Sequence, residues 1–330
     1  MPDLVTLWSG DSFVAELRDW VDAQLATLEL SRSGPLTPAR VRFWAALFHA
    51  PVTGRGVERI WVKVSNPGQS FEGTLLKSLG ALAGTQVVQP IAVDATRGWC
   101  LMPDGGPTAA QADETGPAVW LRLLEQVATL QREIAGHRDQ LAVVPALPLE
   151  SVVDDVDRLL TELSSRHATD PQHLSADATR TARQGLPQLA AAVALLARFD
   201  TPETLQPNDL SLANAFQPIA PGGPLRLFDL GDALWSHPFG VLHVPLRLAV
   251  GAKLSAPLPD SPTAKRLADH YLRCWPEIPP HLGHEVLVAA DRLGAVHRAL
   301  SWRRLLVHVD GNAIPNPPQI ATWVRQAVAR

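Results

Sequence analysis

The chain has 330 residues, 46% of them hydrophobic, and a formal net charge of −4 at pH 7. This length is enough for two lobes with cores of their own, and the lack of a basic excess argues against a general nucleic-acid-binding protein. Two cysteines, Cys100 and Cys274, argue against a disulfide framework, and no apolar run approaches the ~20 residues that cross a bilayer. The chain also starts without a basic segment followed by an apolar core. We therefore expect a cytoplasmic protein without a membrane partner.

The first hundred residues combine helical and strand patterns. Apolar residues at helical spacing predict a helix over residues 11–28. Alternating β-branched and aromatic residues predict a strand over residues 59–64. The same criteria then predict a helix over residues 71–82 and short strands over residues 86–93 and 99–102. This part of the chain is predicted to be a small lobe with an antiparallel sheet, residues 1–103.

A glycine- and proline-rich connector, Pro103-Asp104-Gly105-Gly106-Pro107, separates this lobe from the rest. Beyond it, helical patterns predominate and surround an irregular, strand-like region at residues 204–235. The predicted helices cover residues 117–135, 149–163, 178–199, 285–306 and 318–329. The sequence thus predicts an α+β fold in which residues 104–330 form a larger, mainly helical lobe. A ligand is expected in the cleft between the lobes.

Four short segments carry residues suited to phosphoryl transfer. Lys63 lies in a predicted strand, and Glu72 follows it at the start of a predicted helix. Asp209 and Asn214 are five residues apart in one loop, and Asp229 ends an apolar strand twenty residues beyond Asp209. Phosphoryl transfer needs a cation at the phosphates, a carboxylate at the acceptor hydroxyl and oxygen ligands for Mg²⁺. Each segment alone is common, but their order and spacing together indicate this chemistry.

In this order the segments resemble the aminoglycoside phosphotransferase and choline-kinase-like family of the protein-kinase fold, in particular its bacterial phosphotransferase branch. The resemblance extends over residues 41–303. It includes the catalytic-loop pattern at Asp209, Leu210 and Asn214 and the strand-end pattern Phe228-Asp229-Leu230-Gly231-Asp232-Ala233. It also includes residues 94–106 (DATRGWCLMPDGG) and the helical pattern Ala128-Thr129-Leu130-Gln131. The resemblance implies a two-lobe kinase fold with ATP and Mg²⁺ as cofactors.

The resemblance also assigns roles to single residues. Lys63 would contact the α- and β-phosphates, Glu72 would pair with it, and Asp209 would be the catalytic carboxylate. Asn214 and Asp229 would ligate Mg²⁺. Adenine would bind at the connector that begins at Met102, through the Pro103 carbonyl and the Gly105 amide. Proline at position 103 fits this role because only its carbonyl is used.

Two features depart from the family pattern. The loop histidine two residues before the catalytic aspartate is Pro207 here, which affects the expected loop geometry more than the chemistry. The phosphate-covering turn, expected around residues 42–46, contains no glycine. The segment Thr53-Gly54-Arg55-Gly56 is instead expected to be the hairpin turn before the lysine strand. No Walker-type GxxxxGK[ST] motif occurs in the chain.

Other residues have weaker signals. Asp232 could contact the acceptor, although a turn or capping role fits equally well. Trp235 could face the acceptor, but core packing explains a tryptophan at least as well. His281 and His284 do not have the spacing of a metal site and are expected to be solvated.

The function expected from these residues is an ATP-dependent kinase. It would transfer the γ-phosphate to a hydroxyl of a sugar, amino sugar, aminoglycoside-like or similar small metabolite. The alternative is a catalytically degenerate kinase-fold protein that binds nucleotide or a metabolite as a regulator, which Pro207 and the glycine-poor turn motivate. A third reading is a helical interaction protein, but it requires all five polar residues to be coincidental.

Overall fold

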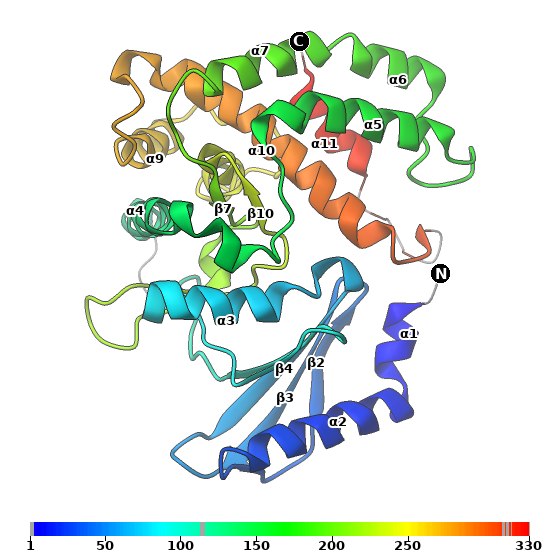
Figure 1. The fold of residues 1–330 in the computed structure, drawn as a ribbon, viewed down its shortest axis with the longest axis vertical. Coiled ribbons are helices and arrows are strands. Elements are labelled where there is room, and N and C mark those ends of the chain that lie inside the picture. Colours follow the sequence, from blue (N-terminus) through cyan, green and yellow to red (C-terminus); the bar gives the residue numbers. More distant parts are fainter. Residues whose placement is uncertain (1–2, 113–115, 312–313, 315–316, 318, 330) are drawn as a thin grey trace.

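The computed structural model describes residues 3–112, 116–311, 314, 317 and 319–329. This part of the chain forms a sheet lobe at one end and a helical lobe at the other (Figure 1). The predicted α+β organisation is therefore present. The last strand of the sheet ends at Pro103, and the chain then crosses to the helical lobe.

The sheet lobe is built on a six-stranded antiparallel sheet with the strand order β1-β3-β4-β6-β5, and β2 pairs with β3 as well. Its strands are β1 (Ser31–Arg32), β2 (Thr37–Arg42), β3 (Ala45–Thr53), β4 (Arg59–Ser65), β5 (Ala92–Asp94) and β6 (Trp99–Pro103). The register places Lys63 on β4 opposite Leu47 of β3 and Cys100 of β6. Lys63 therefore lies on an interior strand. An edge strand would have left it in solvent.

Helices cover the sheet on both sides (Figure 1). They are α1 (Leu4–Ser9), α2 (Asp11–Ala26) and α3 (Glu72–Ala83). Leu17, Val21 and Leu25 recur at helical spacing on α2 and are fully buried in the core. Helix α3 lies between the sheet and the helical lobe, so its first residue is placed at the boundary of the two lobes.

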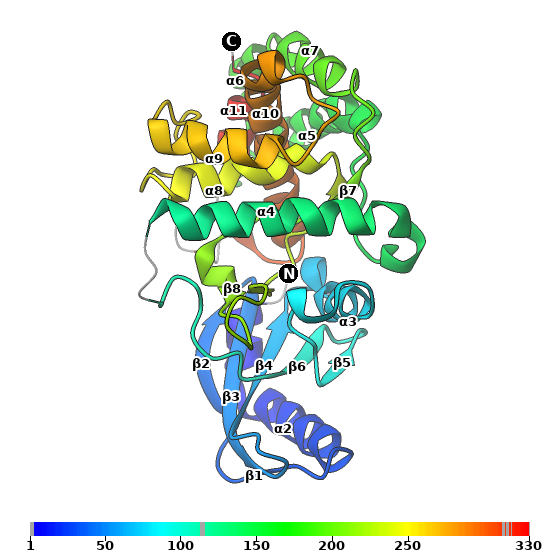
Figure 2. The same cartoon turned by 90° about the vertical axis from the view of Figure 1, so that its left-hand side faces the viewer.

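The helical lobe is organised around one long helix, α10 (Gly283–Leu306), which crosses the lobe (Figures 1 and 2). The other helices are α4 (Pro117–Ile134), α5 (Val152–Ser165), α6 (Ala176–Arg183), α7 (Leu186–Leu196), α8 (His243–Leu248), α9 (Pro262–Leu272) and α11 (Ile320–Ala327). Ser175 and Ser261 cap α6 and α9, each by accepting a hydrogen bond from a backbone amide of the first turn.

The strand-like region at residues 204–235 contains four short strands in two pairs. They are β7 (Thr204–Gln206), β8 (Ala215–Phe216), β9 (Arg226–Leu227) and β10 (Leu234–Ser236), with β7 on β10 and β8 on β9. Short 3₁₀ helices occur at Pro67–Gln69, Gly84–Gln86, Ala135–Leu141, Leu149–Ser151, Leu212–Asn214, Pro238–Leu242 and Pro280–Leu282.

Two predicted elements differ from the structure. The strand expected over residues 86–93 is reduced to β5 at its end, and Val87 instead forms a single bridge with Leu227 of β9. The helix expected over residues 178–199 is two helices, α6 and α7, separated at Gly185. A side chain at Gly185 would approach the Val328 carbonyl oxygen to 2.0 Å, so the close packing of the C-terminal segment requires glycine there.

Candidate active site between the lobes

Lys63 forms ion pairs with two carboxylates, those of Glu72 and Asp229. Its Nζ lies 2.5 Å from Glu72 Oε2 and 2.5 Å from Asp229 Oδ1. Only 7% of the Lys63 side chain and 2% of the Glu72 side chain are exposed, whereas 40% of Asp229 is. Burial alone would lower the pKa of Lys63, but the charges of Asp229 and Glu72 outweigh it and raise that pKa above its ordinary value. The ammonium group is therefore a permanent positive charge at this point.

Glu72 reaches Lys63 because it is the first residue of α3, where a carboxylate is also favoured by the helix dipole. Its second oxygen, Oε1, accepts a hydrogen bond from the Leu230 amide at 3.1 Å. One buried carboxylate thus joins β4 and α3 of the sheet lobe to the segment after β9 of the helical lobe. Residues that are far apart in the sequence, as predicted, meet at one place.

Asp229 has a backbone φ of 59°, in the left-handed region that residues other than glycine seldom adopt. Such a conformation persists where surrounding contacts impose it, and functional sites are its commonest setting. Burial would raise the pKa of Asp229, but Lys63 outweighs burial and lowers it. The carboxylate stays ionised, and it is the partly exposed one of the two carboxylates that pair with Lys63.

Asp209 and Asn214 belong to the loop between β7 and β8. The Asn214 amide nitrogen donates to the Asp209 carbonyl oxygen at 2.9 Å and so closes the loop. The Asp209 carboxylate accepts a hydrogen bond from Arg298 Nη1 at 3.0 Å and keeps 36% of its side chain exposed. Burial raises the pKa of Asp209, and Arg298 opposes that rise.

The oxygen atoms at this place fit a hard cation. Asn214 and Asp229 both line the cavity between the lobes, and both also line the small recess beside Asp209. Because the side-chain nitrogen of Asn214 donates a hydrogen bond within the loop, its side-chain oxygen is the atom left to bind a cation. One amide oxygen, one ionised carboxylate and space for water match the preference of Mg²⁺ for few protein ligands. Among the described residues, no cluster of three His, Cys, Asp or Glu side chains offers another metal site.

The cavity between the lobes has a volume of about 750 Å³, in the range of a small-molecule site. Lys63, Glu72 and Asp229 lie in its wall, and Met102, Pro103 and Gly106 contribute the connector side. Aromatic rings from both lobes complete it: Trp44, Trp61, Phe216 and Phe228.

Gly105 lies behind this wall and is not part of the lining. Its carbonyl accepts a hydrogen bond from Arg226, and a side chain there would come within 2.3 Å of the Phe216 ring. Phe216 in turn stacks on Phe228, with ring centroids 4.1 Å apart. The connector is therefore held against the strand pair that leads to Asp229.

The same fold occurs in solved phosphotransferase structures. The chain superposes on a macrolide 2′-phosphotransferase type I with a TM-score of 0.57 at 16% identity, over 97% of each chain. An ethanolamine kinase from Plasmodium vivax gives a TM-score of 0.63 at 12% identity, over 98% of this chain and 89% of that one. The GDP complex of wild-type aminoglycoside 2′-phosphotransferase-IIIa gives 0.55 at 15% identity, over 87% and 92%.

The chain has the protein-kinase-like fold of the aminoglycoside phosphotransferase and choline-kinase group. The predicted fold class is thereby confirmed. No family model and no curated protein sequence matches the chain.

The turn that the sequence analysis expected to cover the phosphates is a two-residue connection, Phe43–Trp44, between β2 and β3. It lies where the sequence predicted a glycine-free turn. Both rings pack against Trp302 of α10, with ring centroids 6.4 Å apart in each case. Aromatic contact with the helical lobe thus holds a turn that has no glycine.

Helix α10 supplies site residues that the sequence did not reveal. Arg298 pairs with Asp209, Ser301 donates to Asp232, and the Leu305 carbonyl accepts from Asn66. Together with Trp302, these positions follow the spacing i, i+3, i+4 and i+7, which is one face of a helix. That spacing is visible in the sequence, but it marks any buried helix face and does not indicate which partner the face meets.

The two weakly indicated residues have different outcomes. Asp232 lies next to the site, where its Oδ1 accepts hydrogen bonds from Ser301 and from Gln69 Nε2, the latter at 2.9 Å. The expectation that Trp235 faces the acceptor is corrected. Trp235 is 4% exposed and packs in the core of the helical lobe, with the Arg138 guanidinium 5.3 Å from its ring.

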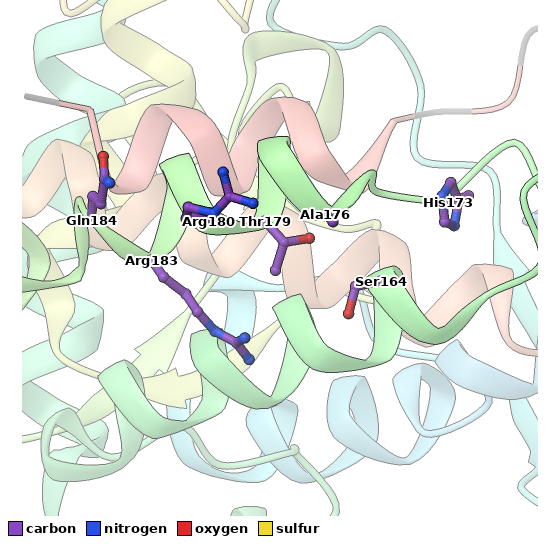
Figure 3. Close-up of a pocket in the computed structure, with 7 residues that line it drawn as sticks. All are labelled: Ser164, His173, Ala176, Thr179, Arg180, Arg183 and Gln184. Atoms are coloured by element: carbon purple, nitrogen blue, oxygen red, sulfur yellow. The ribbon is translucent and has the colours of Figure 1, made fainter.

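A second hollow lies on the helical lobe between α5 and α6 (Figure 3). Its side chains include Arg180 and Arg183, which pair with Asp177 and Asp157. Among the residues that line it there is no carboxylate, so it lacks the carboxylate oxygens found between the lobes.

The helices of the described part of the chain include none with the length and hydrophobicity needed to span a bilayer.

Proposed function

We propose that this protein is an ATP- and Mg²⁺-dependent kinase that transfers the γ-phosphate to a hydroxyl of a small metabolite. The observation that carries the proposal is that Lys63 forms ion pairs with both Glu72 and Asp229 in the wall of the cavity between the lobes. A permanently charged ammonium in the wall of a cavity that Asn214 and Asp229 also line, next to the recess of the partly exposed Asp209, suits a triphosphate better than an uncharged ligand.

In this proposal Lys63 binds the α- and β-phosphates, and Asn214 and Asp229 hold Mg²⁺, which neutralises phosphate charge when bound. The connector at Met102 and Pro103 takes the base, and the Gly105 backbone shapes it from behind. Asp209 orients the acceptor hydroxyl in line with the γ-phosphate. The acceptor oxygen forms a bond to phosphorus as the bond from phosphorus to the ADP oxygen breaks, and the hydroxyl proton passes to Asp209. Positioning and charge supply most of the catalysis in such a reaction.

The test is turnover of Mg-ATP across a panel of sugars, amino sugars, aminoglycosides and amino alcohols. We expect one class of acceptor to be phosphorylated and Asp209→Asn to reduce kcat by about 10²-fold or more, because the acceptor hydroxyl loses its carboxylate. Thermal stabilisation by Mg-ATP should be kept in this variant. Asp177→Asn is the matched control, since this carboxylate is 86% exposed and lies on α6. Equal turnover by Asp209→Asn and wild type would contradict the proposal.

The second candidate is a kinase-fold regulator that binds nucleotide or a metabolite without catalysis. The Arg298–Asp209 ion pair favours it, because the carboxylate that should meet the acceptor already has a cationic partner. The same panel separates the two functions. A regulator would be stabilised by Mg-ATP yet transfer phosphate to no acceptor, and Asp209→Asn would leave its ligand response unchanged.

A further inference from the structure

We propose that Arg298 positions Asp209 and determines the acceptor class, so that the site takes an uncharged or anionic hydroxylated molecule and rejects one with a positive charge beside the reacting hydroxyl. This inference rests on the proposed kinase function and concerns the same site. It starts from the face of α10 that carries Arg298, Ser301 and Trp302 and lies along the catalytic segment.

The guanidinium of Arg298 is fixed in place. The side chain is 5% exposed, and its Nη1 donates to Asp209 Oδ1 at 3.0 Å and to the Asn208 carbonyl at 3.5 Å. Its Cζ lies 5.7 Å from the Trp302 ring centroid and 5.5 Å from that of Trp323 on α11. Two indole rings and a carboxylate make a site that a cation fills well, and Arg298 already fills it.

Arg298 also remains partly unsatisfied. Within the described residues, its buried Nε has no hydrogen-bond partner. A buried guanidinium with a free donor attracts oxygen acceptors and repels a second cation brought to the same carboxylate. An acceptor hydroxyl on Asp209 must therefore sit beside a fixed positive charge.

Protein cations also lie beside the neighbouring carboxylates. Asp229 is paired with Lys63. Asp232 accepts hydrogen bonds from the uncharged Gln69 and Ser301, and the half-buried guanidinium of Arg304 donates to the carbonyls on either side of it, those of Gly231 and Ala233. Each carboxylate around the transfer point thus has a protein cation beside it, which favours an acceptor without a positive charge.

Arg298 also holds the loop that carries Asp209. Pro207 stands where the related kinases have a loop histidine, so the loop has one fewer side chain to hold it. Arg298 bonds both the backbone at Asn208 and the carboxylate at Asp209, and so takes over this positioning.

The experiment uses acceptors that differ in charge alone or nearly so. Choline and 3,3-dimethylbutan-1-ol share one shape, and the pyranoses glucosamine, glucose and glucuronate form a second series. With Mg-ATP and the full-length protein, we expect kcat/KM to be at least tenfold higher for the uncharged or anionic members than for the cationic ones. Arg298→Gln should reduce this preference to less than twofold, and Arg298→Lys should keep it closer to wild type. Arg303→Gln is the control, because this residue lies on the same helix but pairs with Glu162 outside the site.

Preference of the wild type for the cationic member of a pair would overturn the inference, as would an Arg298→Gln variant with unchanged preference. If Arg298→Gln does not fold, the preferences of the wild type and of Arg298→Lys still decide. If Mg-ATP binds but no acceptor is phosphorylated, the kinase proposal fails separately. The Arg298 inference is then judged by thermal stabilisation in the presence of Mg-ADP, where equal stabilisation by charged and uncharged partners, or none by any, overturns it.

Discussion

At the scale of single residues, the site depends on a lysine with two carboxylate partners. Lys63 alone in the sequence would be taken for a solvated strand residue, yet it is buried between Glu72 and Asp229. Glu72 is the more constrained partner, because it is almost fully buried and also accepts the Leu230 amide. A buried ion pair of this kind is expensive to break at one end, since the remaining charge stays out of water.

We therefore predict strong coupling between Lys63 and Glu72 in a double-mutant cycle. Lys63→Met and Glu72→Gln should each lower the free energy of unfolding by about 2–4 kcal/mol, because each leaves a buried group without a partner. The loss in free energy of unfolding of the double variant should be smaller than the sum of the two single losses by about 1–3 kcal/mol. Urea unfolding measures all three. The exposed pair Arg55–Glu29 is the control and should couple by less than about 1 kcal/mol. Additive effects at Lys63 and Glu72 would show that the pair is not formed.

At the scale of elements, the sequence predicted those features that are encoded locally. Alternation located β4, and helical spacing located α2, α3 and α10. The order of the short motifs indicated one common site, and Lys63, Glu72 and Asp229 lie together in the structure. These predictions succeeded because each depends on residues within about twenty positions of one another, or on a family resemblance.

Most features that the sequence analysis did not predict arise from packing between elements that are far apart in the chain. Arg298 meets Asp209 across 89 positions, and nothing near either residue specifies the other. The break at Gly185 comes just before Pro187 in the first turn of α7, so it had a local signal, whereas the burial of Trp235 comes from the fit of β10 into the helical lobe. A tryptophan or a helix face has the same local signal in a core as in a pocket wall, so only the three-dimensional arrangement distinguishes them.

The connector gives a prediction at this scale. A methyl group on residue 105 would meet the Phe216 ring at 2.3 Å, and Phe216 stacks on Phe228 directly before Asp229. Gly105→Ala should therefore displace both rings, lower the free energy of unfolding by about 1–3 kcal/mol and weaken binding of Mg-ATP.

Thermal unfolding and nucleotide titration measure these two effects. Gly136→Ala is the matched control, since no heavy atom lies within 4 Å of its added methyl group, and it should change neither quantity. Phe216→Leu in the Gly105→Ala background should recover part of the loss, because the smaller side chain gives the methyl group room. Tight nucleotide binding by Gly105→Ala would contradict this account of the connector.

At the scale of the whole molecule, the connector and the ion pair of Lys63 with Asp229 are two of the contacts that join the lobes. Another lies between the end of β4 and helix α10. Asn66 is fully buried there, and its side-chain nitrogen donates to the Phe43 carbonyl at 3.0 Å and to the Leu305 carbonyl at 3.4 Å. A side chain at Gly68 would come within 2.2 Å of the Arg304 carbonyl, so the two lobes approach closely. The Phe43–Trp44 turn is therefore attached to the same helix that holds Asp209.

The stability of the molecule should depend on pH through histidines in the core of the helical lobe. Burial lowers the pKa of His237 to about 3 and that of His297 to about 3. An unfolded histidine has an ordinary pKa of about 6.5. Between these values the unfolded chain binds protons that the folded chain does not. Each histidine therefore costs stability as the pH falls below about 6.5, by up to about 1.4 kcal/mol per pH unit, and this loss ends near pH 3.

We predict that His237→Asn removes one such contribution. His237 accepts a hydrogen bond from the Phe239 amide at the start of a 3₁₀ helix, and asparagine can serve as the same kind of cap without titrating. The variant should be less stable than wild type at pH 7, because the smaller side chain leaves a cavity. The difference in free energy of unfolding should then shrink by about 2 kcal/mol between pH 7 and pH 5, since only the wild type loses the His237 contribution over this range. Urea unfolding at a series of pH values measures the difference. A constant difference for His237→Asn would mean that this histidine is not held neutral in the folded protein.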